Sequence, residues 1–244
     1  MTRVLVTGCA GGVGRAVCAE LLHRGHEVVG FDRIASPLEH ETIIADICDS
    51  DAVNAAADGV DGVVHLAATP DESGFIEDLI EPNVRGLFHI CDAARSRNMS
   101  KVVLASSIQV VSGHRWDHPI ALEEGPCVIN HYALTKLWAE TMGEMYARCY
   151  DLSVIAARLG WLPRSPEHHE ELKSSPVGRD VFLSHDDAGR FFTACIEADM
   201  SSGQFEILFA TSIAKDRMRV DLEPAARVVG YVPRDTWPEG IAFS

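Results

Sequence analysis

The stretch R-V-L-V-T-G-C-A-G-G-V-G, residues 3–14, reads as an apolar strand, a glycine-rich turn and the start of a helix. Gly8, Gly11 and Gly14 stand three residues apart in this turn. The first glycine permits a tight bend, the second lets the backbone approach a ligand, and the third lets helix and strand pack closely. Because free amides at a helix N-terminus bind anions, the stretch predicts a phosphate-binding unit.

A second predicted strand, residues 26–31, follows this helix and leads into F-D-R. Asp32 lies at its tip, 18 residues after Gly14. A carboxylate in this position accepts hydrogen bonds from the ribose hydroxyls of an adenosine and repels a 2′-phosphate. The sequence therefore predicts a dinucleotide site that prefers NAD to NADP, a preference that the neighbouring Arg33 weakens.

Short β-branched runs alternate with longer helical stretches through residue 157. The runs are continuously apolar, which is typical of parallel strands covered on both faces. Strict alternation of strands and helices predicts an α/β fold with a Rossmann-type doubly wound parallel sheet and right-handed crossovers. We expect strands at 3–7, 26–31, 42–45, 62–66, 101–106 and 152–157, and helices at about 12–24, 50–58, 77–98 and 130–149.

The alternation loosens after residue 157. Three prolines and a charge cluster in residues 158–180 predict a loop or lid, in which His168 and His169 are solvated rather than metal ligands. A helix at about 185–199, a strand at 204–209 and a short helix at 221–229 follow. We expect a single compact unit in two parts. Residues 1–157 form an NAD-binding Rossmann domain, and residues 158–244 form a small C-terminal substrate lobe that partly completes the sheet.

The 244 residues carry a formal net charge of −15. This charge argues against nucleic acid or an anionic membrane as a partner, because a basic surface is needed to neutralise phosphates. We expect no secretory signal, since the chain enters a strand-like run at once, and no membrane span, which needs roughly 20 apolar residues. Seven dispersed cysteines without C-x-x-C spacing indicate reduced thiols, so we expect a cytoplasmic protein without a metal site.

A tyrosine and a lysine share one face of the predicted helix at 130–149. They belong to Y-A-L-T-K, residues 132–136, and four residues are slightly more than one helical turn. By itself this pair is compatible with an exposed lysine beside a half-buried tyrosine. Its meaning depends on the motifs that surround it.

Those motifs follow one another along the chain: T-G-x-x-G-x-x-G at 7–14, A-D-I at 45–47, H-L-A-A at 65–68, N-V-R-G at 83–86, S-S at 106–107 and Y-x-x-x-K at 132–136. With Asp32, they make the chain resemble the extended short-chain dehydrogenase/reductase superfamily over about residues 1–200. The resemblance implies an NAD-dependent enzyme. The cofactor-binding residues that it implies are Gly8, Gly11, Gly12, Val13, Gly14, Asp32, Arg33, Asp46, Ile47, Leu66, Ala67, Ala68, Asn83, Tyr132 and Lys136.

The resemblance also implies three catalytic residues, Ser107, Tyr132 and Lys136. The family's usual separation between serine and tyrosine selects Ser107 over Ser106, which we expect to end the strand. Tyr132 is then the general base on a substrate hydroxyl, and Ser107 donates a hydrogen bond to the same oxygen. Lys136 holds the nicotinamide ribose. We expect the lysine's positive charge to lower the pKa of Tyr132 from its usual value of about 10.

Within the superfamily the chain resembles the uronate dehydrogenases, in D-G-V-V-H-L-A-A (61–68), N-V-R-G-L-F-H-I-C-D-A-A-R (83–95), R-L-G (158–160) and F-L-S-H-D-D-A-G-R (182–190). These enzymes oxidise the anomeric hydroxyl of a hexuronate to a lactone, with NAD as acceptor. Hexuronates are therefore the first substrates to test. Three residues depart from the pattern: Ile108 and Gln109 replace an Asn-His pair, and Pro70 replaces a serine.

These departures fall where a sugar would be contacted. Gln109 can hydrogen-bond a sugar hydroxyl, and Arg164 or Arg179 can pair with a carboxylate. The resulting candidates for substrate binding are Thr69, Ile108, Gln109, Arg164 and Arg179.

Two other functions stay open on the sequence. The first is a nucleotide-sugar epimerase or dehydratase that retains its NAD, for which the short C-terminal segment leaves little room. The second is a non-catalytic dinucleotide-sensing regulator, against which the retained Tyr132 and Lys136 argue. We also expect a homodimer through helices 77–98 and 130–149. The apolar residues there that can form either the contact or the core are Leu87, Phe88, Ile90, Leu137, Met142 and Met145.

Overall fold

The computed structural model describes residues 1–238. Within this range one sheet holds seven strands in the order β3-β2-β1-β4-β5-β6-β7, and every neighbouring pair is parallel. The doubly wound α/β prediction is confirmed. The strands are β1 (Arg3–Thr7), β2 (Glu27–Asp32), β3 (Glu41–Ile44), β4 (Gly62–His65), β5 (Lys101–Ser107), β6 (Ser153–Leu159) and β7 (Phe205–Ala210).

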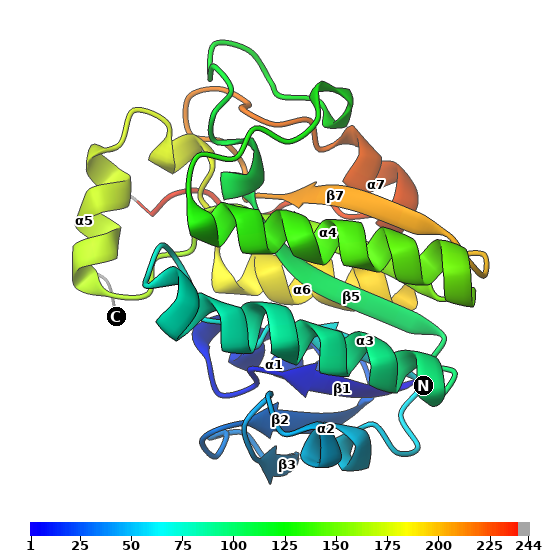
Figure 1. Ribbon diagram of the computed structural model, residues 1–244. Helices are drawn as coiled ribbons and strands as arrows, with labels where there is room; N and C mark the ends of the chain where they lie inside the picture. The colour runs from blue at the N-terminus through cyan, green and yellow to red at the C-terminus, as the bar shows by residue number, and fades with distance from the viewer. Residues whose placement is uncertain (239–244) are drawn as a thin grey trace.

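Two layers of helices cover the sheet, one on each face (Figure 1). On one face, α1 (Gly12–His23) and α6 (His185–Glu197) pack against each other, with α7 (Glu223–Val229) beside them. On the other face lie α2 (Ser50–Ala56), α3 (Leu87–Ser96) and α4 (His131–Tyr150). The strands are apolar on both sides for this reason: Val4 and Val6 of β1 join the core under α1, and Leu5 joins the core under α3.

The predicted helix at 77–98 is not one regular α-helix. Residues Phe75–Gly86, labelled η1, form wide π-helical turns that run directly into α3. Pro82 lies inside η1. Proline has no N–H to donate and its ring collides with the carbonyl four residues earlier, so a regular α-helix cannot continue through it.

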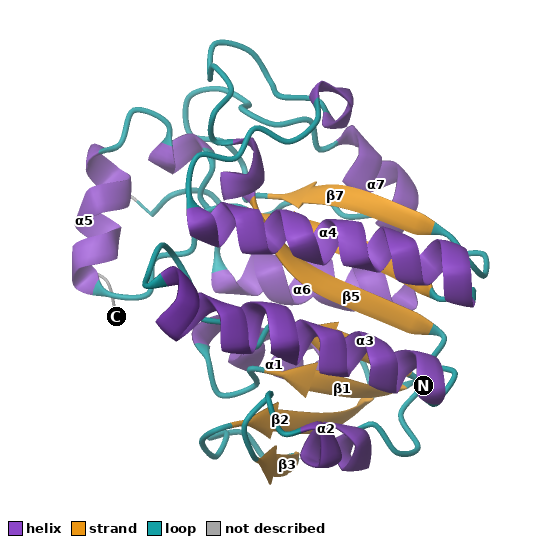
Figure 2. Cartoon of the chain, in the orientation of Figure 1, coloured by secondary structure: helices purple, strands orange, loops and turns teal. Residues whose placement is uncertain are grey.

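The prediction of a loop over residues 158–180 is wrong in part. β6 extends to Leu159, and α5 (Pro166–Ser174) forms a helix that stands apart from the two layers (Figure 2). Ser165 caps this helix by accepting a hydrogen bond from the His168 amide, and Pro166 occupies its first turn. His169 is buried rather than solvated, because its ring stacks on Trp237 with 4.5 Å between ring centres.

The segment after β7 returns to the start of α6. The carboxylate of Asp187, which is fully buried, accepts hydrogen bonds from the amides of Arg234 and Asp235, each at 3.0 Å. Arg190 pairs with both Asp187 and Asp235. The last described residues therefore fix the N-terminal turn of α6. Residues 239–244 of the expected C-terminal lobe lie outside the described range.

The residues expected at a dimer contact divide between core and surface. Leu87 and Ile90 of α3 are buried against the sheet, whereas Phe88 of the same helix is 48% exposed. Leu134 and Trp138, one turn apart on α4, are also exposed, and the sequence patterns did not indicate them. The loops that carry the candidate site residues lie at the carboxyl ends of the strands. In Figure 1 this is the side toward which the arrowheads point and where α5 lies.

No helix within residues 1–238 has both the length and the apolar character that crossing a membrane requires. Over the same range, no group of three or more histidine, cysteine, aspartate or glutamate side chains is arranged to hold a metal ion.

Candidate active site

A cleft of about 750 Å³ opens at the carboxyl ends of β1, β4, β5 and β6. We call it the main cleft; the glycine turn, Ser107, Tyr132, Lys136 and Arg164 line it. A second hollow of about 610 Å³, the side hollow, opens at the ends of β1, β2 and β4. Gly8, Gly11, Leu66 and Ala68 line both spaces, so the two are continuous.

The glycine turn leaves no room for side chains at its ends. Gly8 has φ +73°, and a Cβ there would lie 2.9 Å from the Ala67 nitrogen. A Cβ on Gly14 would lie 2.0 Å from the Gly8 carbonyl oxygen. Both distances are shorter than a carbon atom tolerates, so only glycine fits. The amides of Gly12, Val13 and Gly14 in the first turn of α1 have no acceptor within the helix, and these residues line the cleft. This arrangement fits a pyrophosphate.

Asp32 ends β2 and lines the side hollow. One carboxylate oxygen accepts a hydrogen bond from the Ala10 amide at 3.0 Å, which fixes the side chain beside the glycine turn. Four more of the residues predicted to bind the dinucleotide, Arg33, Asp46, Ile47 and Ala67, line the same side hollow.

Two predicted site residues have different surroundings from those expected. Thr69 lines the side hollow rather than the main cleft, so the structure places it on the dinucleotide side. Asn83 is buried and lines neither space. Its amide group donates to the Thr69 carbonyl at 3.0 Å and to the Thr135 hydroxyl at 3.1 Å, and it accepts from the Thr69 amide at 2.8 Å. Asn83 therefore holds the loop after β4 against α4.

Ser107, Tyr132 and Lys136 meet in the main cleft. Ser107 is the last residue of β5; its hydroxyl oxygen accepts from the Gln109 amide at 3.1 Å, and its side chain lies beside that of Tyr132. The Lys136 ammonium lies 5.5 Å from the centre of the Tyr132 ring and donates to the Ala105 carbonyl at 3.0 Å. Ser106 is used elsewhere, because its hydroxyl donates to Glu140 at 2.6 Å. This leaves Ser107 as the serine beside the tyrosine.

A buried ion pair supports α4 beneath these residues. Glu140 lies one turn after Lys136 and binds the Arg158 guanidinium of β6 through two bonds, at 2.8 and 2.9 Å. Their side chains are 3% and 2% exposed. The pair therefore fixes the helix that carries Tyr132 to the strand beside Ser107.

The expected lowering of the Tyr132 pKa is not what the structure gives. Burial raises the pKa of Tyr132, and the nearby Asp71 carboxylate raises it further; the Ser107 hydrogen bond and Arg164 oppose these effects. Burial also lowers the pKa of Lys136, to about 8. In this environment desolvation of both groups outweighs the attraction that a cation offers to tyrosinate.

His65 lies under the site and is buried. The Thr7 hydroxyl oxygen accepts from the amides of Leu66 and Ala67, both at 3.2 Å, so its one hydrogen points to His65 Nδ1 at 2.8 Å. Burial and the neighbouring Lys136 lower the pKa of His65 to about 3. The imidazole is therefore neutral and carries its proton on Nε2.

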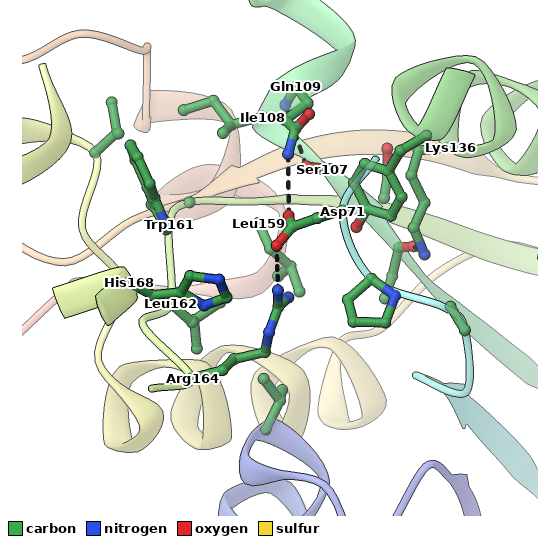
Figure 3. A pocket seen from close by; sticks show the side chains of 18 of the residues that line it. Asp71, Ser107, Ile108, Gln109, Lys136, Leu159, Trp161, Leu162, Arg164 and His168 are labelled. Atoms are coloured by element: carbon green, nitrogen blue, oxygen red, sulfur yellow. Dashed lines mark hydrogen bonds and ion pairs between the residues drawn. The ribbon is translucent and has the colours of Figure 1, made fainter. Parts of the chain in front are cut away.

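Beyond Tyr132 the main cleft holds a line of polar side chains, which we call the substrate end. Asp71, in the loop after β4, pairs with the Arg164 guanidinium and accepts from the Gln109 amide at 3.3 Å (Figure 3). The Gln109 oxygen accepts from Asn130, which also caps α4, at 2.7 Å. Ile108 lines the same space.

Arg164 and Arg179 are the alternative candidates for pairing with a substrate carboxylate, and of the two only Arg164 lines the cleft. Arg179 belongs to the 3₁₀ turn Gly178–Asp180 and lies 3.5 Å from Asp216. The substrate end also contains residues that the sequence did not indicate: Asp71, Asn130, Trp116, Trp161, His168 and Glu171. His168 and Glu171 reach the cleft because residues 166–174 form α5, for which the capping pair Ser165-Pro166 is a sequence signal.

Comparison with known proteins gives a consistent result. The family model for the NAD dependent epimerase/dehydratase family matches residues 4–170. The chain is 32% identical to an NAD-dependent glucose-6-phosphate dehydrogenase of Haloferax volcanii, over 97% of this chain and 94% of that protein. It is 28% identical to an L-arabinose 1-dehydrogenase (NAD(P)(+)) of the same organism, over 96% of this chain and 97% of that protein.

Among solved structures, the uronate dehydrogenase from Agrobacterium tumefaciens is similar to this chain with a TM-score of 0.82. The two sequences are 25% identical, and the match covers 96% of this chain and 85% of the other.

Proposed function

The chain belongs to the NAD dependent epimerase/dehydratase family, and from this premise we propose that it is an NAD-dependent dehydrogenase acting on a hydroxyl of a small sugar or sugar acid. One observation carries the proposal. Tyr132, beside Ser107 and close to Lys136, lines the same cleft as the glycine turn, and a polar substrate end continues beyond it.

The residues of the cleft have separate tasks in this reaction. Tyr132 removes the proton from the substrate hydroxyl, and the Ser107 hydroxyl donates a hydrogen bond to the same oxygen. Lys136 holds the ribose next to the reacting ring and places a positive charge near the tyrosine. When bound, NAD accepts the hydride from the carbon that carries the hydroxyl.

The side hollow supports NAD as the acceptor. Asp32 offers a carboxylate oxygen toward the adenosine ribose, and a 2′-phosphate would meet its negative charge. We expect NAD to bind more tightly than NADP, which calorimetry with both cofactors measures. Equal or tighter binding of NADP would show that Arg33, not Asp32, governs this hollow.

The main cleft favours a small substrate over a nucleotide sugar. A second pyrophosphate needs cations, and apart from Lys136 and the histidines only Arg164 supplies one among the described residues that line the cleft. Residues 1–157 bind the dinucleotide in this proposal, and residues 158–244 shape the substrate end. The similar proteins named above act on a phosphorylated sugar, a neutral pentose and a uronate.

The proposed function is tested by product analysis. The protein is incubated with excess NAD and, separately, with aldoses, hexuronates, polyols and UDP-sugars, while NADH is followed by absorbance and products by mass. We expect NADH to accumulate with a sugar product two hydrogens lighter. An isomer of a UDP-sugar formed without net NADH would overturn the proposal in favour of epimerisation.

A homodimer is part of the same proposal. Phe88 on α3 and Leu134 and Trp138 on α4 are apolar and 45 to 49% exposed on one helical layer, which a second copy would cover. We expect Trp138→Lys to convert a dimer into a monomer in analytical ultracentrifugation. A wild-type protein that sediments as a monomer at micromolar concentration would contradict this part.

A cytoplasmic location also belongs to the proposal. All seven cysteines are free thiols in the structure. Such thiols are typical of a reducing compartment. Fractionation of the source cells with an antibody to the protein checks the location.

A further inference from the structure

The charges at the substrate end are mostly negative. Asp71, Glu72 and Glu171 line it, against the single guanidinium of Arg164. The Glu72 carboxylate is already hydrogen-bonded to the start of α4: it accepts from the Tyr132 amide at 2.9 Å and from the His131 ring at 2.8 Å. Asp71 and Glu171 remain the carboxylates that a bound molecule would meet.

The Arg164 guanidinium is already engaged. Arg164 and Asp71 form an ion pair at the entrance, with side chains 40% and 47% exposed (Figure 3). Asp71 has φ +60°, a left-handed conformation that aspartate adopts more readily than most residues. In this conformation its two oxygens engage two partners, Arg164 on one side and the Gln109 amide on the other.

Neutral hydroxyl groups match this arrangement. A hydroxyl can donate to an Asp71 oxygen and accept from the Gln109 or Arg164 N–H groups, so it can be inserted without leaving a charge unpaired. The indole rings of Trp116 and Trp161 line the same space and offer apolar faces to the C–H side of a sugar ring.

An anionic group does not match it. A carboxylate or phosphate at this place would lie against Asp71 and Glu171 and would compete with Asp71 for the only guanidinium. It would also add negative charge near Tyr132, whose pKa Asp71 already raises. Each further negative charge raises the pKa of this tyrosine, so a smaller fraction of it is tyrosinate at a given pH.

We propose that the substrate end selects an uncharged sugar, and that Asp71 is the specificity-determining residue that disfavours uronates and sugar phosphates. This inference rests on the proposed dehydrogenase function, and it narrows the substrate class within it.

Matched sugars test the inference, because they differ in charge at one carbon. D-glucose, D-glucuronate and D-glucose 6-phosphate form one set, and D-galactose and D-galacturonate form another. We expect kcat/KM for the better neutral sugar to exceed that for its charged counterparts at least about tenfold, which corresponds to about 1.4 kcal/mol. NADH formation is measured at low ionic strength and again in 0.5 M salt, where the ratio should fall because the pair is half-exposed.

The variant Asp71→Asn tests whether the charge of Asp71 causes the selectivity. Asparagine keeps the size and tolerates the left-handed conformation, but it removes the charge and frees Arg164. We expect the ratio of charged to neutral kcat/KM to rise about tenfold. Glu144→Gln on α4 is the matched control; Glu144 is exposed and lines neither space, so the ratio should not change.

Each outcome has a distinct meaning. A charged sugar used as well as or better than its neutral counterpart would overturn the selectivity and leave the dehydrogenase function standing. An unchanged ratio in Asp71→Asn would overturn the role of Asp71. If neither these sugars nor the wider panel of aldoses, hexuronates and polyols yields NADH while NAD binding is intact, the proposed function fails, and this inference fails with it.

Discussion

At the scale of single residues, the Tyr132 hydroxyl is the group on which the proposed reaction depends. Tyr132→Phe removes only this oxygen, so we expect NAD affinity and fold to be retained while kcat falls by about 10² to 10⁴. Lys136→Ala should lower both kcat and NAD affinity, because the ammonium faces both the tyrosine and the proposed ribose position. Steady-state kinetics and calorimetry separate the two effects.

A Tyr132→Phe protein with near-normal kcat would mean that another group is the base. Ser107→Ala is the companion variant. It should lower kcat without changing NAD affinity, since the Ser107 side chain lies beside Tyr132 and has no hydrogen bond to the glycine turn.

The charges that face Tyr132 also predict a pH dependence. Asp71 raises the pKa of Tyr132, whereas Arg164 and the Ser107 hydrogen bond lower it; Lys136 lies on the same helix. Activity requires tyrosinate, so kcat should rise with pH. Removing the Asp71 charge lowers the pKa of Tyr132, and the rising limb of kcat in Asp71→Asn should therefore move to lower pH. The measurement is kcat at saturating neutral sugar across the pH range; a limb that moves to higher pH would contradict the argument.

At the scale of elements, the Glu140–Arg158 pair fastens α4 to β6. Glu140→Gln leaves the Arg158 guanidinium buried without its counter-charge, and we expect the free energy of unfolding to fall by about 3 to 5 kcal/mol. Chemical denaturation measures the loss. Glu144→Gln, one turn further along α4 and exposed, should change stability by about 0.5 kcal/mol or less. A loss below about 1 kcal/mol in Glu140→Gln would show that the pair is not a main anchor.

The elements were predictable where one local signal dominated. The strands and helices of the first 157 residues follow from apolar runs and glycine or proline boundaries, and their order fixes the sheet. Two elements were not resolved in this way. The π-helical turns of η1 arise from Pro82 inside an otherwise helical pattern. In α5, proline and charge suggested a loop, although Ser165-Pro166 is also a helix start.

At the scale of the whole molecule, His65 couples stability to pH. The pKa of His65 is about 3 in the folded protein, against an ordinary value of 6.5. Between these two pH values the imidazole is protonated in the unfolded chain and neutral in the folded protein. Stability should therefore fall as pH falls, by about 2 kcal/mol between pH 7 and pH 5 from this residue alone. In His65→Asn, an amide oxygen still accepts from Thr7 and this contribution disappears.

Urea denaturation of both proteins at the two pH values checks the coupling. The difference in stability between pH 7 and pH 5 should be smaller in His65→Asn, and effects of other titrating groups cancel in the comparison. An equal difference in both proteins would show that His65 is protonated in the fold.

The dinucleotide side of the site could be predicted from sequence because its parts are local: a turn, a strand tip and a helix face. The substrate end could not. Arg164 and Asp71 are 93 residues apart, and they meet because β4 and β6 end at the same edge of the sheet and Asp71 adopts a left-handed conformation. No pattern in the sequence predicts this long-range ion pair. Arg179 illustrates the converse, since a cation in the right segment binds Asp216 outside the cleft.

The contact between Asp187 and the amides of residues 234 and 235 also sets an order of events during synthesis on the ribosome. The Asp235 amide is made 48 residues after Asp187, so at about 5 to 20 residues per second it arrives roughly 2 to 10 seconds later. During that delay the buried carboxylate of Asp187 lacks these two backbone partners. His185, at the same helix start, lies against Gly12 of the phosphate turn. A nascent chain therefore completes these contacts in the first turn of α6, which lies against Gly12, only after translation has passed residue 235.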